Sequence, residues 1–154
     1  MNPRFFSEFD LKQMRLALSE AKKASRTSPN PPVGAVLVEG QQVISTGYHR
    51  GPGKPHAEIE ALLKAKRPLK NATLYVTLEP CCHKDKRTPP CAQSILNRGI
   101  TRVVIACKDP NPKVNGRGIS LLRKNQIKVE VGCLQKEAQY LIRFYQKWIS
   151  QKRP

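Results

Sequence analysis

The sequence predicts an α/β fold in which a mixed five-stranded sheet lies between two layers of helices, a three-layer α/β/α sandwich. Segments with the apolar spacing of helices alternate along the chain with short apolar runs that are typical of strands. This alternation places helices on both faces of a sheet. A length of 154 residues suits one domain, so we expect a single domain over residues 1–154.

The first predicted helix has apolar residues at helical spacing from Leu11 to Ala21. Asp10, with Gln13 three residues later, resembles a capping box at its start. The proline-rich residues 28–32 end this helix in a loop. Later helices are predicted at residues 56–66, 92–98, 119–124 and 135–151. The last of them carries an apolar face of Ala138, Leu141, Ile142, Tyr145, Trp148 and Ile149.

Five apolar runs predict the strands, at residues 33–38, 42–48, 72–78, 102–106 and 127–131. Glu39 and Gly40 form a turn between the first two runs, so we expect these strands to pair as a hairpin. Gly99 ends the helix that precedes the fourth strand.

The chain is strongly basic, with 28 Lys and Arg against 11 Asp and Glu and a net charge of +17. Such a field attracts anions, either phosphorylated metabolites or nucleic acid. The basic residues are spread along the chain, which favours a solvated surface and leaves nucleic-acid binding as the alternative. No apolar run approaches the roughly 20 residues that span a bilayer, and residues 1–12 lack the features of a secretory signal. We therefore expect a cytoplasmic protein without membrane contact.

The five cysteines are Cys81, Cys82, Cys91, Cys107 and Cys133. An odd number without an export signal argues against a disulfide framework. The last two lie in or beside apolar runs, so we interpret them as core residues. The first three lie close together in the sequence, beside a histidine, which indicates metal binding.

The motif His56-Ala57-Glu58 opens a predicted helix, and Cys91 lies where the next helix begins. With Cys81, these residues offer one imidazole and two thiolates. Three protein ligands leave the fourth tetrahedral position of Zn²⁺ for water, which is typical of a catalytic zinc site. Glu58 is then the predicted proton shuttle, as in hydrolytic deamination of a heterocyclic base. The alternative is a structural zinc site, completed by Cys82 or His83, or no metal site.

Eight segments carry a resemblance to a known family: residues 27–31, 33–36, 47–49, 56–58, 75–81, 87–91, 109–112 and 116–118. The sequence resembles the pyrimidine deaminase of riboflavin biosynthesis, which belongs to the cytidine deaminase superfamily and is usually the N-terminal half of a bifunctional deaminase–reductase. The resemblance extends from about Met14 to Phe144, nearly the whole chain. The motif His56-Ala57-Glu58 alone indicates only the superfamily, whereas the segments Thr88-Pro89-Pro90-Cys91 and Asp109-Pro110-Asn111-Pro112 are far more specific.

The resemblance implies a cytidine-deaminase-like fold, Zn²⁺, and the substrate 2,5-diamino-6-ribosylamino-4(3H)-pyrimidinone 5′-phosphate. It implies that the base and ribose pocket is lined by Asn30, His49, His83, Asp109 and Asn111. Arg87 would hold the substrate phosphate, because a guanidinium fork matches phosphate geometry. Asn30 and Asn111 lie beside prolines and are also ordinary turn formers, an alternative that their sequence context leaves open.

Three departures from the family pattern affect the expected function. The sequence shows no reductase half, so we expect a separate reductase to act on the product. Nine residues separate Cys81 from Cys91, one more than the family pattern. Cys82 stands where a serine is expected. These changes affect the expected substrate more than the expected reaction.

Two other functions remain as alternatives. One is a zinc deaminase acting on a base in RNA, such as transfer RNA, or on another nucleoside or nucleotide. The net charge favours it, but Lys84 stands where the second cysteine of a short Cys-x-x-Cys motif would fall. The other is a zinc-stabilised binding module without turnover. Deaminases of this fold are often oligomers, so a homo-oligomer is compatible with the sequence.

Overall fold

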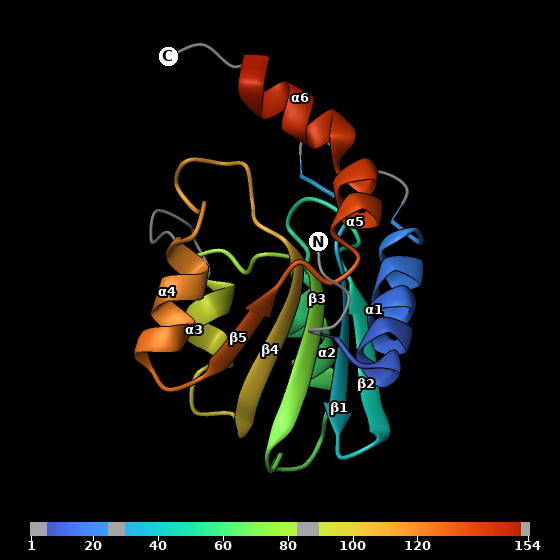
Figure 1. The fold of residues 1–154 in the computed structure, drawn as a ribbon, viewed down its shortest axis with the longest axis vertical. Helices are drawn as coiled ribbons and strands as arrows, with labels where there is room; N and C mark the ends of the chain where they lie inside the picture. The colour runs from blue at the N-terminus through green and yellow to red at the C-terminus, as the bar shows by residue number, and fades with distance from the viewer. Residues whose placement is uncertain (1–5, 25–29, 83–89, 152–154) are drawn as a thin grey trace.

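The structure is a computed structural model that describes residues 6–24, 30–82 and 90–151. Figure 1 shows the arrangement of its helices and strands. In chain order the elements are α1 (Glu8–Ala21), β1 (Gly34–Glu39), β2 (Gln42–Tyr48), α2 (Ala57–Lys64), β3 (Ala72–Leu78), α3 (Cys91–Ile95), β4 (Ile100–Cys107), α4 (Arg117–Lys124), β5 (Lys128–Val131), α5 (Gln135–Leu141) and α6 (Arg143–Gln151).

The strands form one mixed sheet in the order β2-β1-β3-β4-β5. β1 pairs antiparallel with both β2 and β3, whereas β3, β4 and β5 are parallel. The mixed five-stranded sheet and the β1–β2 hairpin predicted from the sequence are therefore confirmed. Because β3 and β4 are parallel, the segments that follow them leave the sheet at the same edge, where ligands bind in open α/β sheets.

Alternate residues of the central strands enter two separate cores. Leu74 and Val76 pack with the helices α2, α3 and α4 on one face of the sheet, while Tyr75 packs with α1 and α5 on the other. The helical layers lie on opposite faces of the sheet in Figure 1. This is the side-chain alternation expected of strands buried on both faces, and it confirms the three-layer sandwich.

Two glycines allow helices to lie directly against the hairpin. A Cβ atom added to Gly34 would lie 1.9 Å from the carbonyl oxygen of Ala17 in α1. One added to Gly47 would lie 2.4 Å from the carbonyl oxygen of Ala57 in α2. Both distances are far inside van der Waals contact, so any larger residue would push a helix away from the sheet.

The first helix begins earlier than the sequence pattern indicated. Ser7 is its N-cap: its Oγ accepts a hydrogen bond from Asp10 N (3.0 Å), and Oδ2 of Asp10 accepts one from Ser7 N (3.2 Å). The capping box predicted at Asp10 and Gln13 was therefore wrong by three residues. The motif Ser-x-x-Asp was present in the sequence, and Asp10 is its third helical residue rather than its cap.

The long C-terminal helix predicted over residues 135–151 is two helices, α5 and α6, separated at Ile142. Ala138 and Ile142 are buried as expected, but α6 buries none of its residues. Beyond the break, Tyr145 of the predicted apolar face still packs partly against the second core, whereas Trp148 is 44% exposed. Figure 1 shows the reason: α6 extends past the end of the sheet, where no strand is available to cover it. None of the helices described is both long and apolar enough to span a membrane.

Candidate functional site

Three predicted metal ligands meet at the edge of the sheet where β3 ends. His56 is the N-cap of α2, Cys91 is the first residue of α3, and Cys81 lies three residues beyond the end of β3. Their ligand atoms all lie within 4.8 Å of one another. The fold therefore brings together residues that are up to 35 positions apart in the sequence.

The spacing of these atoms fits a tetrahedral zinc ion. His56 Nδ1 lies 3.0 Å from Cys91 Sγ and 3.8 Å from Cys81 Sγ. Zinc bonds of about 2.0 Å to nitrogen and 2.3 Å to sulfur place such ligands about 3.5 Å apart. Cys91 N also donates a hydrogen bond to Cys81 Sγ (3.2 Å), which favours the thiolate form that binds metal.

Among the described residues, Cys82 is not part of the group of candidate metal ligands formed by His56, Cys81 and Cys91. Its Sγ lies 3.7 Å from the carbonyl oxygen of Lys113, to which the thiol donates. Burial raises the pKa of the Cys82 thiol, and the charges of Glu79 and Cys81 raise it further, so the group stays protonated. The geometry therefore does not support Cys82 as the fourth ligand of a structural zinc site.

The predicted proton shuttle, Glu58, lies in the first turn of α2, two residues after His56. Its side chain is buried, with an exposure of 3%. A helix N-terminus is a favourable place for a carboxylate, because the unpaired backbone N–H groups carry partial positive charge. The structure thus places a buried carboxylic acid in the helix turn that follows the candidate metal ligand His56.

Asn30 and His49 lie together beside the metal cluster. The buried His49 accepts a hydrogen bond at Nε2 from Asn30 Nδ2 (3.2 Å) and donates one from Nδ1 to the carbonyl oxygen of Pro55 (3.2 Å). These bonds are compatible with one neutral tautomer, with the proton on Nδ1. The His49 ring stands edge-on to the His56 ring, with centroids 5.1 Å apart.

Asp109 and Asn111 lie in the loop that follows β4. Oδ1 of the buried Asp109 accepts hydrogen bonds from Asn111 N (2.9 Å) and from the hydroxyl of Tyr145 (2.9 Å). Burial raises the pKa of Asp109 above its ordinary value, and these two bonds oppose the effect. Asn111 Oδ1 accepts from Lys113 N (3.0 Å), so its carbonyl also closes a turn.

Sequence reasoning missed the contribution of Tyr145 to this loop, because nothing in its local pattern indicates a partner 36 residues away. Two predicted substrate residues, His83 and Arg87, lie outside the described residues, as does the position of the additional loop residue. The predicted phosphate contact therefore stays a prediction.

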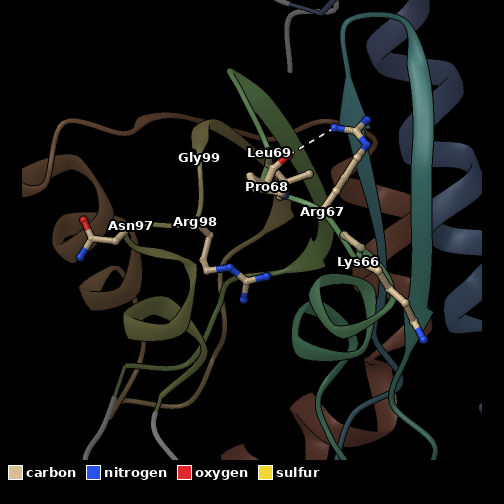
Figure 2. A pocket seen from close by; sticks show the side chains of 8 residues that line it. Lys66, Arg67, Pro68, Leu69, Asn97, Arg98 and Gly99 are labelled. Carbon is tan, nitrogen blue, oxygen red and sulfur yellow. Dashed lines mark hydrogen bonds between the residues drawn. The ribbon is translucent and has the colours of Figure 1, made fainter.

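A shallow hollow of about 450 Å³ lies elsewhere, where the chain enters β3 and β4. Figure 2 shows its lining, which includes Arg67, Asn97 and Arg98. Arg67 pairs with Glu39 (2.6 Å), and an N–H of Arg98 points to the carbonyl oxygen of Leu62 (3.5 Å). The hollow contains none of the predicted site residues, so the group formed by His56, Cys81 and Cys91 remains the candidate site.

Residues 7–107 match the family model described as the cytidine and deoxycytidylate deaminase zinc-binding region. The chain is 50% identical to the riboflavin biosynthesis protein RibD of Aquifex aeolicus, over 96% of this chain and 41% of that protein. It is 45% identical to the diaminohydroxyphosphoribosylamino-pyrimidine deaminase of Buchnera aphidicola subsp. Schizaphis graminum, over 81% of this chain and 88% of that protein.

A solved structure from Thermotoga maritima, described as a diaminohydroxyphosphoribosylaminopyrimidine deaminase/5-amino-6-(5-phosphoribosylamino)uracil reductase, superposes with a TM-score of 0.87 at 42% identity. The match covers 94% of this chain and 42% of that one. The chain therefore spans about two-fifths of the length of the RibD-type relatives that it matches.

Proposed function

The chain belongs to the cytidine and deoxycytidylate deaminase family, and we propose that it is a zinc-dependent hydrolase that deaminates 2,5-diamino-6-ribosylamino-4(3H)-pyrimidinone 5′-phosphate in riboflavin biosynthesis. The observation that carries this proposal is the meeting of His56, Cys81 and Cys91 beside the helix turn that holds Glu58. The identity to a deaminase of nearly the same length supports the substrate.

In this proposal His56, Cys81 and Cys91 hold the zinc ion. When bound, Zn²⁺ supplies a Lewis acid that activates water for attack on the ring carbon bearing the amino group. Glu58 takes one proton from the attacking water and delivers it to the ring nitrogen, then takes the second proton of the same oxygen and delivers it to the amino group, which leaves as ammonia. The burial of Glu58 suits this role, because a carboxylate removed from solvent can hold a proton between these two transfers.

The residues beside the cluster orient the substrate. Asn30 and His49 form one side of the proposed base pocket, and their mutual hydrogen bond fixes both polar groups. Asp109 and Asn111 form the other side and bind base or ribose groups. We assign His83 to the same pocket and Arg87 to the phosphate, by resemblance and by the match between guanidinium and phosphate geometry.

We also propose that residues 1–154 act as one cytoplasmic deaminase domain, whose product passes to a reductase. The name of the Thermotoga maritima relative, which pairs a deaminase with a reductase, supports this partner. A homo-oligomer remains a prediction that the size of the purified protein in solution would test.

A deamination assay on the zinc-loaded protein tests the function. We expect ammonia release from the diaminopyrimidine substrate by the wild type, and at least about a 10³-fold loss in Glu58→Gln with zinc retained. Glu60→Gln is the matched control, because Glu60 lies on the same helix but bonds Tyr48 N and Arg50. Equal rates in the wild type and Glu58→Gln would contradict the role of Glu58.

Absence of ammonia release, with one zinc bound per chain, would contradict the proposed substrate. The alternative of RNA deamination is then favoured by the exposed aromatic residues Tyr140, Phe144 and Trp148 on a protein of net charge +17, since aromatic rings and cations together bind single strands. Transfer RNA would serve as the substrate, and a steep fall of affinity with salt would support this alternative.

A further inference from the structure

We infer that Glu79 is a positioning residue, which fixes the loop carrying Asp109 and Asn111 relative to the zinc ligand Cys81. Glu79 directly follows β3, lies two residues before Cys81, and is 3% exposed. The inference rests on the proposed function in two respects, that this loop lines the substrate pocket and that Cys81 is a zinc ligand. Glu79 itself is assigned no contact with substrate or zinc.

The carboxylate of Glu79 accepts four backbone hydrogen bonds from one segment. Oε1 accepts from Asp109 N (3.1 Å) and Gly116 N (3.0 Å), and Oε2 accepts from Gly118 N (3.0 Å) and Ile119 N (3.2 Å). Each oxygen thus receives two N–H groups, which uses the full acceptor capacity of a carboxylate. The loop is closed at both ends by the same side chain.

The backbone of Glu79 is fixed as well. Glu79 N donates to the carbonyl oxygen of Cys107 (3.0 Å), which continues the pairing between β3 and β4 beyond the strand ends. The carboxylate therefore projects from a fixed point of the sheet edge. Since Cys81 is two residues further along the same segment, the loop and the metal ligand share one anchor.

Two of the four bonds also complete the N-terminus of α4. Its N-cap is Gly116, which has no side chain to accept from the first turn. Gly118 and Ile119 are the second and third residues of the helix, the positions whose N–H groups an N-cap side chain normally receives. Glu79 supplies this cap from β3, and its negative charge suits the positive end of the helix dipole.

Gly118 is necessary for this approach. A Cβ atom at Gly118 would lie 2.2 Å from the carbonyl oxygen of Pro80 and 3.4 Å from Cγ of Glu79. A larger residue would push the start of α4 away from Pro80 and break the two hydrogen bonds to Oε2. The motif of residues 116–118 therefore has a physical role in the site, because its backbone N–H groups donate to the carboxylate of Glu79.

Asp109 is consequently held from two sides. Its backbone N–H is bound by Glu79, while its carboxylate is bound by Tyr145 and by Asn111 N. Loss of the Glu79 contacts frees the backbone of Asp109 without touching a metal ligand. Substrate affinity should therefore fall while the chemical step is retained, which separates a positioning role from a metal-binding one.

Glu79→Gln tests the inference, because an amide NH₂ replaces one oxygen and leaves two of the four N–H groups without an acceptor. We expect one zinc per chain, kcat within about twofold of wild type and KM raised about tenfold. Hydrogen exchange should accelerate at the amides of Asp109, Gly116, Gly118 and Ile119. Glu39→Gln is the matched control, since Glu39 bonds Arg67 and Lys70 N at the other end of the sheet; it should leave KM unchanged.

Glu79→Asp keeps the charge but shortens the side chain, so its KM should lie between those of the wild type and Glu79→Gln. If Glu79→Gln fails to fold, Glu79→Asp replaces it in every measurement. An unchanged KM, or a joint loss of zinc and kcat, would overturn the inference. If the wild type does not deaminate this pyrimidine, the proposed substrate fails and hydrogen exchange alone decides. Acceleration confined to the four amides would then support the inference, and unchanged or uniformly faster exchange would overturn it.

Discussion

The hydroxyl of Tyr145 donates a hydrogen bond of 2.9 Å to Oδ1 of Asp109. Burial raises the pKa of Tyr145 above its ordinary value, and the neighbouring charge of Asp109 raises it further, so the phenol keeps its proton at neutral pH. The bond connects α6, a helix with no fully buried residue, to the loop that carries two predicted substrate residues. The C-terminal helix therefore contributes to the candidate site.

Tyr145→Phe removes this bond and leaves Asp109 Oδ1 with one donor, Asn111 N. We expect a loss of about 1 kcal/mol in the free energy of unfolding, the usual net contribution of one hydrogen bond, and a severalfold rise in KM. Urea unfolding and steady-state kinetics measure the two effects. Tyr140→Phe is the control, because Tyr140 is 65% exposed; equal behaviour of the two variants would contradict the connection between α6 and the loop.

Cys91 and Cys82 should differ in their effect on zinc. Cys91→Ser removes a proposed ligand from the cluster, so we expect less than about 0.1 zinc per chain and no deamination, because three protein ligands are needed for a catalytic site. Cys82→Ser should keep one zinc per chain, since the Cys82 sulfur faces the carbonyl oxygen of Lys113 instead. Elemental analysis of the purified variants measures the zinc, and zinc loss in Cys82→Ser would show that Cys82 is a ligand.

The sequence predicted best those features that depend on local patterns. The bounds of β2 and β3 match the expected ones, because their apolar runs are bounded by turn residues. The predicted metal ligands His56, Cys81 and Cys91 were selected by residue type and spacing, and the fold brings them together. Helix ends were less predictable, because the break at Ile142 depends on where the sheet ends rather than on periodicity.

The contacts that organise the site could not be predicted in this way. Glu79 binds N–H groups 30 to 40 residues away, and Tyr145 reaches back 36 residues to Asp109. Such partners are determined by the strand order and by the parallel pairing of β3 and β4, which local propensity does not encode. The contacts of Asp10 could not be predicted from local patterns either. Its position in the capping box was misassigned, and its side chain also joins three elements of the fold.

Asp10 is the centre of a buried polar cluster. Its carboxylate accepts hydrogen bonds from Tyr75 Oη (2.7 Å), from both NH groups of Arg102 (3.0 and 2.9 Å) and from Ser7 N (3.2 Å). Arg102 also contacts Glu130 at 2.6 Å. Burial alone would raise the pKa of Asp10, but the bonds from Arg102, Tyr75 and Ser7 lower it from 3.8 to about 2.

This lowered pKa predicts how stability depends on pH. Because the unfolded chain binds the proton more readily than the folded one, Asp10 stabilises the fold above about pH 4, and the contribution is lost as the pH falls towards 2. The pKa difference corresponds to about 2 kcal/mol.

Urea unfolding of the wild type and Asp10→Asn from pH 2 to 6 should give stability curves that converge at low pH. Protonation of the metal ligands affects both proteins equally, so it cancels in the difference between the two curves. The exposed Glu8→Gln on the same helix turn should follow the wild type; parallel curves for Asp10→Asn and the wild type would show that Asp10 is not the titrating group.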